Sequence, residues 1–240
     1  MNAMRLPNLD TLAIAARRGR NTIRGVCDGL YRKVLRRPPS GEYQPYSFTS
    51  PDRYPWLFKF AATRLGSRPD LRILSFGCSR GEEVFSLRKY FPSATLKGID
   101  INPRNIASCQ ARARAENSRG VTFEIASTTA GEPTGTYDAI FCLAVLCNAN
   151  LTTSGAQRCY PVLHFEKFER LVSDFARCLK PGGLLALHTT NFRFCDTQVA
   201  RDFDVVLEAD PTHLAPDVHF SRDNRLITGA RYRAVGFEKR

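Results

Sequence analysis

A glycine-rich turn carries the clearest chemical signal in this 240-residue sequence. It runs from Gly77 to Gly81 and continues directly into two carboxylates, Glu82 and Glu83. Small residues between a strand and a helix let the backbone approach a ligand closely, and the start of the helix presents free N–H groups. Carboxylates there repel a pyrophosphate but pair with an ammonium group. The turn therefore favours an adenosine ligand that bears an amino acid over a dinucleotide.

A second acidic position, Asp100, ends the next apolar run, about 20 residues beyond the turn. An acid at the tip of the second strand of a nucleotide-binding fold accepts hydrogen bonds from the ribose hydroxyls. Alone, the turn could be an ordinary connection, and the acid could cap a helix. The combination of the two at this spacing predicts nucleoside binding.

The elements that must position these residues alternate along the chain. We expect strands at residues 72–76, 95–99, 121–125, 137–143 and 184–189, and helices at residues 55–65, 82–90, 103–116 and 165–179. Asn102-Pro103 is typical of a helix start, and Lys180-Pro181-Gly182-Gly183 of a helix end followed by a turn. This order predicts an α/β fold with a Rossmann-like, doubly wound, mostly parallel sheet. Two further runs, 203–208 and 231–238, predict a C-terminal antiparallel strand pair, with a turn at residues 222–224.

Three motifs carry a resemblance to a known family. Residues 73–87, ILSFGCSRGEEVFSL, are similar to the cofactor loop of the chemotaxis-receptor methyltransferases, CSTGEEPYSL. Residues 137–142, YDAIFC, are similar to a fourth strand, and residues 179–185, LKPGGLL, to a turn and fifth strand. Residues 72–190 thus resemble a class I S-adenosylmethionine-dependent methyltransferase, which implies S-adenosylmethionine as cofactor and S-adenosylhomocysteine as product.

The resemblance also implies the residues of the cofactor site. Glu82 would be the partner of the methionine amino group and Asp100 that of the ribose. Ser127 and Thr128 would lie near the adenine, and Leu143 beside the methionine end. The complete implied set is Gly77, Cys78, Ser79, Gly81, Glu82, Asp100, Ile101, Ser127, Thr128 and Leu143.

The sequence departs from the receptor methyltransferases where a substrate should bind. Their fourth strand continues as CRNV, whereas residues 142–145 here are CLAV. Their fifth strand ends near GHSE, whereas residues 187–191 are LHTTN. The Asn/Asp-Pro-Pro-Tyr motif of nucleic-acid amino methyltransferases is missing as well. These differences disfavour receptor and nucleic-acid base methylation and favour an O or N atom of a small-molecule or glycan acceptor.

Two other functions stay open. One is a protein or nucleic-acid methyltransferase recruited through a basic N-terminal arm, and the other is a non-catalytic nucleoside-binding domain. An oxygen acceptor needs a general base near neutral pH. His188 is a candidate because strand carboxyl ends form the binding crevice of such sheets, although it is equally a structural histidine. His164 beside Tyr160 is another candidate, because it lies in a segment that often closes over the acceptor. His213 and His219 lie in the C-terminal segment, which could also reach the site.

The N-terminal region accounts for most of the excess positive charge. Residues 1–40 hold nine basic and two acidic side chains, a net +7 of the total +12, and their apolar residues recur at helical spacing. We expect a basic amphipathic helical extension that packs on the domain, touches a membrane surface, serves as a presequence or binds a polyanion. An aromatic-rich lid or linker with a helix would occupy residues 41–70, and the methyltransferase domain residues 71–240.

Eight cysteines occur without any C-x-x-C pair or Cys/His cluster, which favours free thiols over disulfides and predicts no metal site. No apolar stretch approaches the roughly 20 residues of a membrane span, and no secretory signal is recognisable. These features predict a cytoplasmic protein.

Overall fold

The computed structural model describes residues 43–44, 47–213, 218–229 and 231–240. The predicted N-terminal extension, residues 1–40, lies outside the described residues. The chain divides into two compact units, and the fold below is that of the unit holding residues 49–240.

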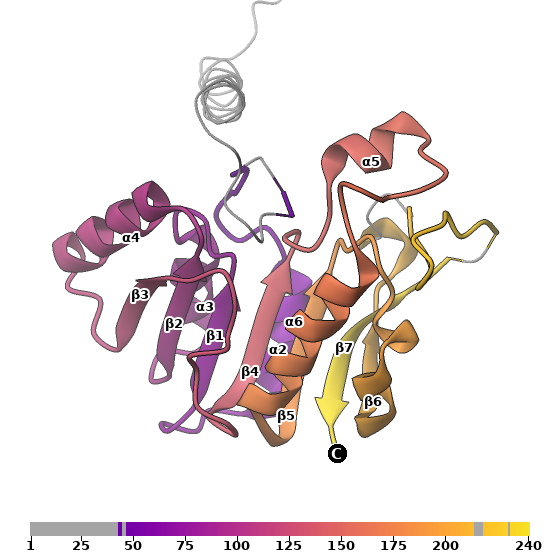
Figure 1. Ribbon diagram of the computed structural model, residues 1–240. Coiled ribbons are helices and arrows are strands. Elements are labelled where there is room, and N and C mark those ends of the chain that lie inside the picture. The colour runs from indigo at the N-terminus through magenta and orange to yellow at the C-terminus, as the bar shows by residue number, and fades with distance from the viewer. Residues whose placement is uncertain (1–42, 45–46, 214–217, 230) are drawn as a thin grey trace, which may run out of the picture. The chain divides into compact units, whose positions relative to one another are not determined.

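A seven-stranded sheet forms the centre of this unit, in the order β3-β2-β1-β4-β5-β7-β6 (Figure 1). The five strands from β3 to β5 are parallel, and β7 pairs antiparallel with both β5 and β6. The predicted mostly parallel sheet with a C-terminal antiparallel pair is therefore confirmed. The strands are β1 Arg72–Phe76, β2 Thr95–Asp100, β3 Val121–Ile125, β4 Tyr137–Leu143, β5 Leu179–His188, β6 Phe203–Glu208 and β7 Ala234–Lys239.

Helices cover both faces of the sheet. Successive side chains of a strand point to opposite faces, and the central strands have apolar residues on both. Ile73 of β1 and Phe141 of β4 contribute to one core, and Leu74 and Cys142 to the other. The first core packs against α2 Pro55–Leu65, α3 Glu82–Tyr90 and α4 Pro103–Ala115. The second packs against α6 Phe165–Cys178, which lies on the near face in Figure 1.

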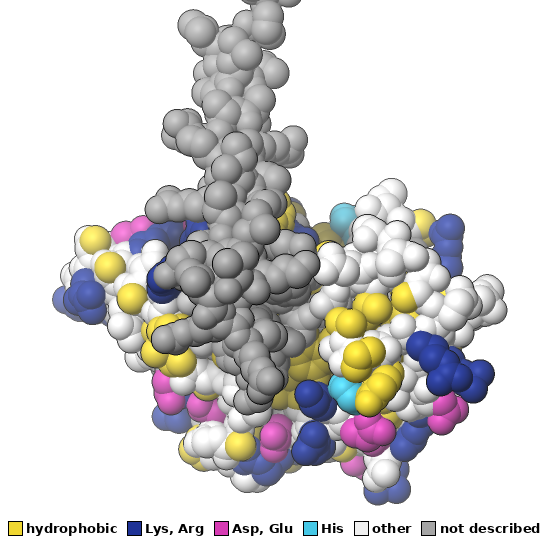
Figure 2. Space-filling model, turned by 45° about the horizontal axis from the view of Figure 1, so that its top comes forward, with side chains coloured by type: hydrophobic (Ala, Val, Ile, Leu, Met, Phe, Trp, Pro, Cys, Tyr) yellow, Lys and Arg dark blue, Asp and Glu magenta, His cyan; other side chains and the backbone are white. Residues whose placement is uncertain are grey.

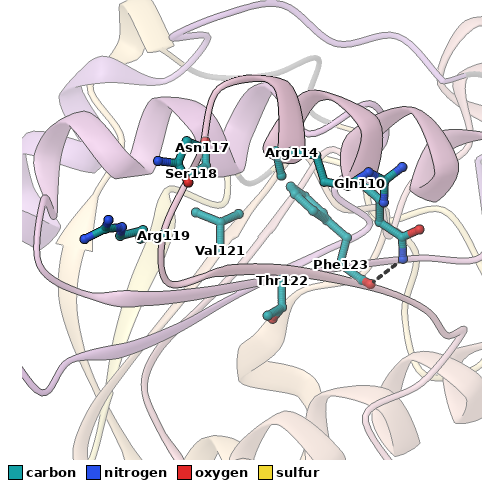
Figure 3. A pocket seen from close by; sticks show the side chains of 9 residues that line it. Gln110, Arg114, Asn117, Ser118, Arg119, Val121, Thr122 and Phe123 are labelled. Atoms are coloured by element: carbon teal, nitrogen blue, oxygen red, sulfur yellow. Dashed lines mark hydrogen bonds between the residues drawn. The ribbon is translucent and has the colours of Figure 1, made fainter.

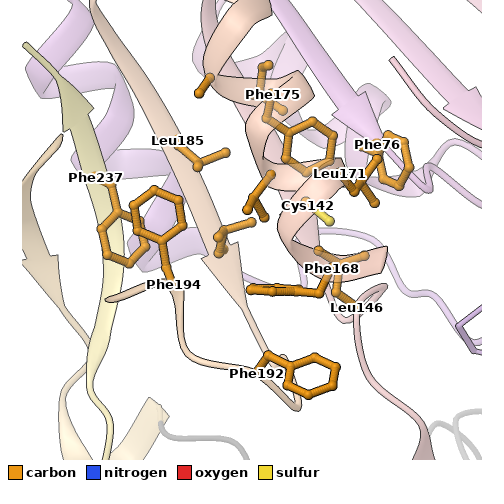
Figure 4. Close-up of a cluster of buried hydrophobic side chains, with 14 of the residues drawn as sticks. Phe76, Cys142, Leu146, Phe168, Leu171, Phe175, Leu185, Phe192, Phe194 and Phe237 are labelled. Carbon is orange, nitrogen blue, oxygen red and sulfur yellow. The ribbon is translucent and has the colours of Figure 1, made fainter. Parts of the chain in front are cut away.

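Aromatic side chains fill the core beneath α6 (Figure 4). Phe76 of β1 meets Phe175 of α6 edge-on at 4.9 Å between ring centroids. Phe194 meets Phe237 of β7 at 4.4 Å. Such pairs contribute about 0.5–1.5 kcal/mol each beyond their burial. The first pair ties α6 to the parallel part of the sheet, and the second ties the segment after β5 to β7.

Three features differ from the expectation. A short helix, α5 Ala149–Ser154, follows β4 and was not predicted. Strand β5 begins at Leu179, so the predicted Lys180–Gly183 turn is a bulged strand start in which Gly182 has φ +72°. Strand β7 begins at Ala234, three residues later than expected. The predicted turn at 222–224 is present, closed by the Asn224 N–H donating to the Ser221 carbonyl at 2.9 Å.

No helix in the described part of the chain combines the length and the apolar character that a membrane crossing requires. Six of the seven described cysteines are buried, and all seven are free thiols.

Candidate functional site

The turn after β1 is anchored to the end of β2. The backbone N–H groups of Gly77 and Cys78 both donate to the carbonyl of Ile99, at 2.8 and 2.9 Å. Gly77 and Gly81 adopt φ of +72° and +84°, and Ser79 between them adopts +51°. The turn is thus held in a conformation that brings its backbone to the carboxyl edge of the sheet, where ligands of open α/β folds bind.

Both glycines are required by their surroundings as well as by φ. A Cβ added to Gly77 would stand 2.5 Å from Cγ2 of Val145. A Cβ on Gly81 would stand 2.9 Å from the ring of Phe85 and 3.1 Å from the sulfur of Cys109. A hydrogen bond with Cys109 raises the pKa of the neighbouring Cys78 thiol, and burial raises it further. Cys78 is therefore a packing residue of the turn, with an inert thiol.

Asp100 holds the turn from the side. Its carboxylate accepts hydrogen bonds from the backbone N–H of Ser79 at 2.9 Å, from that of Asn102 at 2.8 Å and from the Asn105 side chain at 3.1 Å. The residue is only 8% exposed. A carboxylate offers about four acceptor positions. Asp100 therefore fixes the turn with three of them and keeps about one for a ligand hydroxyl.

The segment after β3 reaches the same edge. The Ala126 N–H donates to the carbonyl of Asp100 at 3.1 Å, which places Ser127 and Thr128 just beyond the tip of β2. Ile101 follows Asp100 directly and is half-buried. The expected ribose and adenine positions therefore lie on neighbouring strand ends, although Thr128 is exposed.

The carboxyl ends of β4 and β5 complete the edge. Leu143 is buried at the end of β4, and the next residue, Ala144, has φ +58° and donates its N–H to the His188 carbonyl at 2.8 Å. Thr189, directly after β5, has φ +56°. Together with Ser79, these give each of the three central strands a non-glycine residue in the left-handed region just beyond its carboxyl end. Such residues store about 1–3 kcal/mol each and concentrate at functional sites.

The two glutamates of the turn have different environments. Glu82 forms an ion pair with Arg112 of α4, Oε2 to Nη1 at 3.1 Å. Glu83 turns toward the sheet and accepts a hydrogen bond from Ser75 Oγ of β1 at 2.8 Å. Burial raises the pKa of the Glu83 carboxyl to about 7, against the opposing effects of the Ser75 hydrogen bond and the Arg53 charge. The resemblance pointed to Glu82, but Glu83 is the glutamate that lies among the ends of the central strands.

His188 is 6% exposed, and both of its ring nitrogens are engaged. Nε2 lies 2.9 Å from the carbonyl oxygen of His213, and Nδ1 lies 2.8 Å from the Thr189 hydroxyl. Because a carbonyl oxygen only accepts, Nε2 carries the proton and Nδ1 accepts from Thr189. Burial, assisted by the Arg53 charge, lowers the pKa of the ring, against the raising effect of the His213 hydrogen bond. Because both ring nitrogens already have hydrogen-bond partners, the arrangement favours the structural interpretation over that of a general base.

Tyr160 and His164 do lie together, with their rings edge-on at 5.0 Å between centroids. Tyr160 is 63% exposed, and His164 is the residue before α6. Their segment is held by Asn224, whose side-chain oxygen accepts from the Phe165 N–H at 2.9 Å. The pair therefore lies at the carboxyl edge of the sheet but on its outer surface.

Two buried asparagines join the loops of the acceptor side. The Asn148 N–H donates to Asn191 Oδ1 at 2.6 Å, and Asn191 Nδ2 donates to the Val218 carbonyl at 2.8 Å. Asn148 Nδ2 donates to the Tyr43 carbonyl at 3.0 Å. The loops after β4 and β5 and the segment at Tyr43 are thereby fixed to one another.

An aromatic group that was not predicted as part of the site packs against His188. The ring of Tyr54 lies 5.0 Å from it, and that of Trp56 lies 5.7 Å from it and stacks on His213 at 4.8 Å. The guanidinium of Arg53 lies over the Tyr54 ring at 5.1 Å. The only sequence signal for these residues was the aromatic character of residues 41–70, for which a lid and a linker were the alternatives.

A groove of about 640 Å³ lies elsewhere, between the C-terminal half of α4 and β3 (Figure 3). Its lining includes Arg114, Arg119 and Phe123, whose carbonyl accepts from the Gln110 side chain at 3.1 Å. The groove includes the start of β3, so it faces away from the carboxyl edge that carries Gly77 and Asp100. Across residues 43–44, 47–213, 218–229 and 231–240, no three His, Cys, Asp or Glu side chains gather to hold a metal ion.

A family model described as a methyltransferase domain matches residues 67–223, more than half of the chain. The chain belongs to this methyltransferase family. The matched residues contain the turn after β1, Asp100, the end of β4 and all of β5. The predicted enzyme class is thereby confirmed, and the predicted donor, S-adenosylmethionine, agrees with it. The closer likeness of the turn to chemotaxis-receptor methyltransferases stays a prediction.

Solved structures similar to this chain include other methyltransferases. One is geranyl diphosphate C-methyltransferase from Streptomyces coelicolor A3(2), with 18% identity over 55% of this chain and 45% of that chain and a TM-score of 0.41. Another is phosphoethanolamine N-methyltransferase 2 from Haemonchus contortus, with 18% identity over 59% and 29% and a TM-score of 0.44. The matches span less than half the length of these two proteins. No curated protein sequence matches the chain.

Proposed function

We propose that this methyltransferase transfers a methyl group from S-adenosylmethionine to an O or N atom of a small-molecule or glycan acceptor, leaving S-adenosylhomocysteine. One observation carries the cofactor assignment. The turn Gly77–Gly81 is locked to the tip of β2 both through the Ile99 carbonyl and through the Asp100 carboxylate. This arrangement presents backbone groups and one remaining carboxylate position to a nucleoside.

The residues present fit the amino-acid end of that cofactor. Glu83 offers a partly buried carboxylate to an ammonium group, and Arg53 places a positive charge close enough to lower the Glu83 pKa. The methionine end of the cofactor is a zwitterion, whose ammonium and carboxylate groups complement the charges of Glu83 and Arg53. We therefore propose Glu83 as the partner of the methionine ammonium group, with Glu82 acting through its ion pair with Arg112. Cys78, Ile101, Ser127, Thr128 and Leu143 remain proposed cofactor contacts.

The bound cofactor supplies a methyl group on a positively charged sulfur. The contribution of the chain is alignment, because fixing two reactants in line lowers the barrier by as much as about 7–11 kcal/mol. The Gly77–Gly81 turn and Asp100 fix one reactant. The loops joined by Asn148 and Asn191 are our candidates for the side of the site that holds the acceptor. His164, Tyr160 and His188 remain proposed acceptor-side residues, and His188 requires a broken hydrogen bond before it can take a proton.

Calorimetry of the full chain with S-adenosylhomocysteine tests this function. We expect saturable one-to-one binding that Asp100→Asn weakens. Absence of binding to the wild-type chain would refute the cofactor assignment and would favour a domain that has lost the activity of its family.

A macromolecular acceptor is the second candidate, and the net +7 of residues 1–40 favours it. On the face shown in Figure 2, in contrast, basic side chains are interspersed with acidic ones rather than gathered in one patch. Deletion of residues 1–40 distinguishes the two candidates. Loss of binding to RNA or to anionic liposomes on deletion supports recruitment or a peripheral membrane contact through this region, and unchanged binding supports the small-molecule function. The buried free thiols support our proposal of a reducing, cytoplasmic location.

A further inference from the structure

The hydroxyl of Tyr54 is a buried polar atom that the proposed cofactor site does not use. Tyr54 is 8% exposed, and its Oη has no hydrogen-bond partner. The Thr189 hydroxyl lies near enough to lower the phenol pKa, but no hydrogen bond of ordinary geometry joins the two. Leaving such a group unpaired costs about 1–3 kcal/mol, and buried polar groups in native proteins almost always have partners. A bound molecule with a hydrogen-bonding group could supply the partner that the chain does not give to this hydroxyl.

The surroundings of this hydroxyl place it at the carboxyl edge. Burial raises the phenol pKa most, Arg53 and Thr189 lower it, and Glu83 and Cys147 raise it. The Tyr54 ring lies 5.0 Å from that of His188, the last residue of β5. Glu83 lies in the first turn of α3 after β1, Cys147 follows β4, and Thr189 follows β5. The hydroxyl thus lies among the ends of the three central strands, next to the glutamate that we assign to the methionine end of the cofactor.

A second unpaired polar atom approaches the same position. Gln44 Nε2 donates to the sulfur of Cys147 at 3.6 Å, whereas the side-chain oxygen of Gln44 is buried without a partner. Gln44 thus contacts Cys147 in the loop after β4, and the Tyr54 ring contacts His188 at the end of β5, the strand that pairs with β4. Ser79 Oγ is also unpaired, but it belongs to the cofactor turn.

We propose that Tyr54 and Gln44 form the acceptor subsite beside Cys147 and that they select an acceptor bearing an O–H or N–H donor. This inference rests on the proposed function. An amide oxygen only accepts hydrogen bonds, so the group that binds Gln44 must donate. An acceptor without a donor would leave the amide oxygen unpaired, and sites of this kind discriminate strongly against such analogues. The subsite is thus suited to hydroxyl or amine methylation rather than to methylation of a hydrocarbon carbon.

The first experiment compares thermal unfolding of the unliganded wild-type chain with that of Tyr54→Phe and Tyr90→Phe. The Tyr90 hydroxyl donates to Asp52 at 3.0 Å and serves as the matched paired control. We expect Tyr54→Phe to raise the Tm by a few degrees and Tyr90→Phe to lower it. A lower Tm for Tyr54→Phe would show that its hydroxyl already has a partner in the chain, which would overturn the proposal.

The second experiment measures fragment binding to the S-adenosylhomocysteine-loaded chain by ligand-observed NMR. The probes are phenol against anisole and benzyl alcohol against benzyl methyl ether, which differ in the donor. We expect at least fivefold tighter binding of the donor-bearing member and loss of this preference in Tyr54→Phe and Gln44→Met. Equal binding within each pair overturns the inference, and so does a failure of both phenol and benzyl alcohol to bind. Failure of S-adenosylhomocysteine to bind would refute the proposed function instead, and the unfolding comparison would still decide whether the Tyr54 hydroxyl awaits a ligand.

Discussion

The side chain of Val145 lies directly against the backbone of Gly77, so that a Cβ on Gly77 would come within 2.5 Å of Val145 Cγ2 and 2.8 Å of its Cγ1. The loop after β4 therefore rests on the turn after β1. The two segments that border the methionine end of the proposed cofactor site are packed as one unit.

Gly77→Ala tests this packing. We expect a loss of about 2–4 kcal/mol in the free energy of unfolding, from the added methyl group and from the positive φ. Val145→Ala in the same chain should restore part of that loss, because it removes the methyl groups that clash. Urea unfolding of the two single variants and the double variant measures the coupling. Strictly additive effects would contradict the contact.

Asp100→Asn keeps the shape of the side chain and removes its charge. We expect affinity for S-adenosylhomocysteine to fall by about 1–3 kcal/mol, because three N–H donors and a ligand hydroxyl lose a charged acceptor. Calorimetry measures the change, with Asp174→Asn on the surface of α6 as the control. An unchanged dissociation constant for Asp100→Asn would exclude Asp100 from the cofactor site.

Glu83→Gln and Glu82→Gln form a matched pair of adjacent substitutions. If Glu83 binds the ammonium group, its variant should lose at least tenfold in cofactor affinity, about 1.4 kcal/mol. The same variant should be more stable than the wild type without ligand at pH 8, because it removes a buried charge. Glu82→Gln should change affinity less, since it removes only a half-exposed ion pair. The reverse order of the two affinities would favour the original assignment to Glu82.

The pH dependence of binding follows from the pKa of Glu83, which burial raises to about 7. An ammonium ligand binds the ionised carboxylate, so affinity should rise between pH 6 and pH 8. In the unliganded chain the sign is opposite. The carboxyl ionises more easily when unfolded, so its contribution to stability is complete below pH 4.5 and is lost as pH rises to about 7. Calorimetry and thermal unfolding across this range measure both trends, and Glu83→Gln should abolish them.

Asn191→Ala removes the link between the acceptor-side loops. It leaves the Asn148 N–H and the Val218 carbonyl without their partner, at a cost of about 2–4 kcal/mol. Asn150→Ala, on the exposed surface of α5, should stay within about 0.5 kcal/mol of the wild type. Chemical unfolding measures both. We further expect Asn191→Ala to retain the affinity of the wild type for S-adenosylhomocysteine, because none of these bonds touches the cofactor turn.

Much of the fold was predictable because its signals are local. The Asn102 side chain accepts from the Arg104 N–H at 3.1 Å, as expected for the cap of α4. The central strands were recognisable from apolar runs buried on both faces. Helix α5 had no such signal, since only Leu151 of its six residues is buried. The start of β5 was missed because Pro181, Gly182 and Gly183 are typical of a turn, whereas pairing of Leu179 with Tyr137 extends the strand.

The strand order predicted that the candidate site residues meet at one edge of the sheet, but the sequence could not predict the orientation of their side chains. Glu82 and Glu83 are equivalent in sequence, and only the packing of α3 shows that Glu83 meets Ser75 of β1 whereas Glu82 meets Arg112 of α4. Tyr54 lies near the site only because α2 packs behind the sheet, which is a tertiary relationship. The position of His188 after the fifth strand was readable from the sequence, but its hydrogen bond to His213, 25 residues later, was not.

The left-handed residues Ser79, Ala144 and Thr189 have a consequence for the dynamics of the sheet. At the opposite edge, Asp138 is held by Lys180 at 2.8 Å and by the Arg72 N–H at 2.9 Å. Both ends of these strands are hydrogen-bonded to their surroundings, but only the carboxyl end also stores backbone strain. Amide hydrogen exchange should be graded along each central strand, slow at the amino end and faster toward the carboxyl end. A bound ligand would then slow exchange chiefly where the unliganded chain opens most readily.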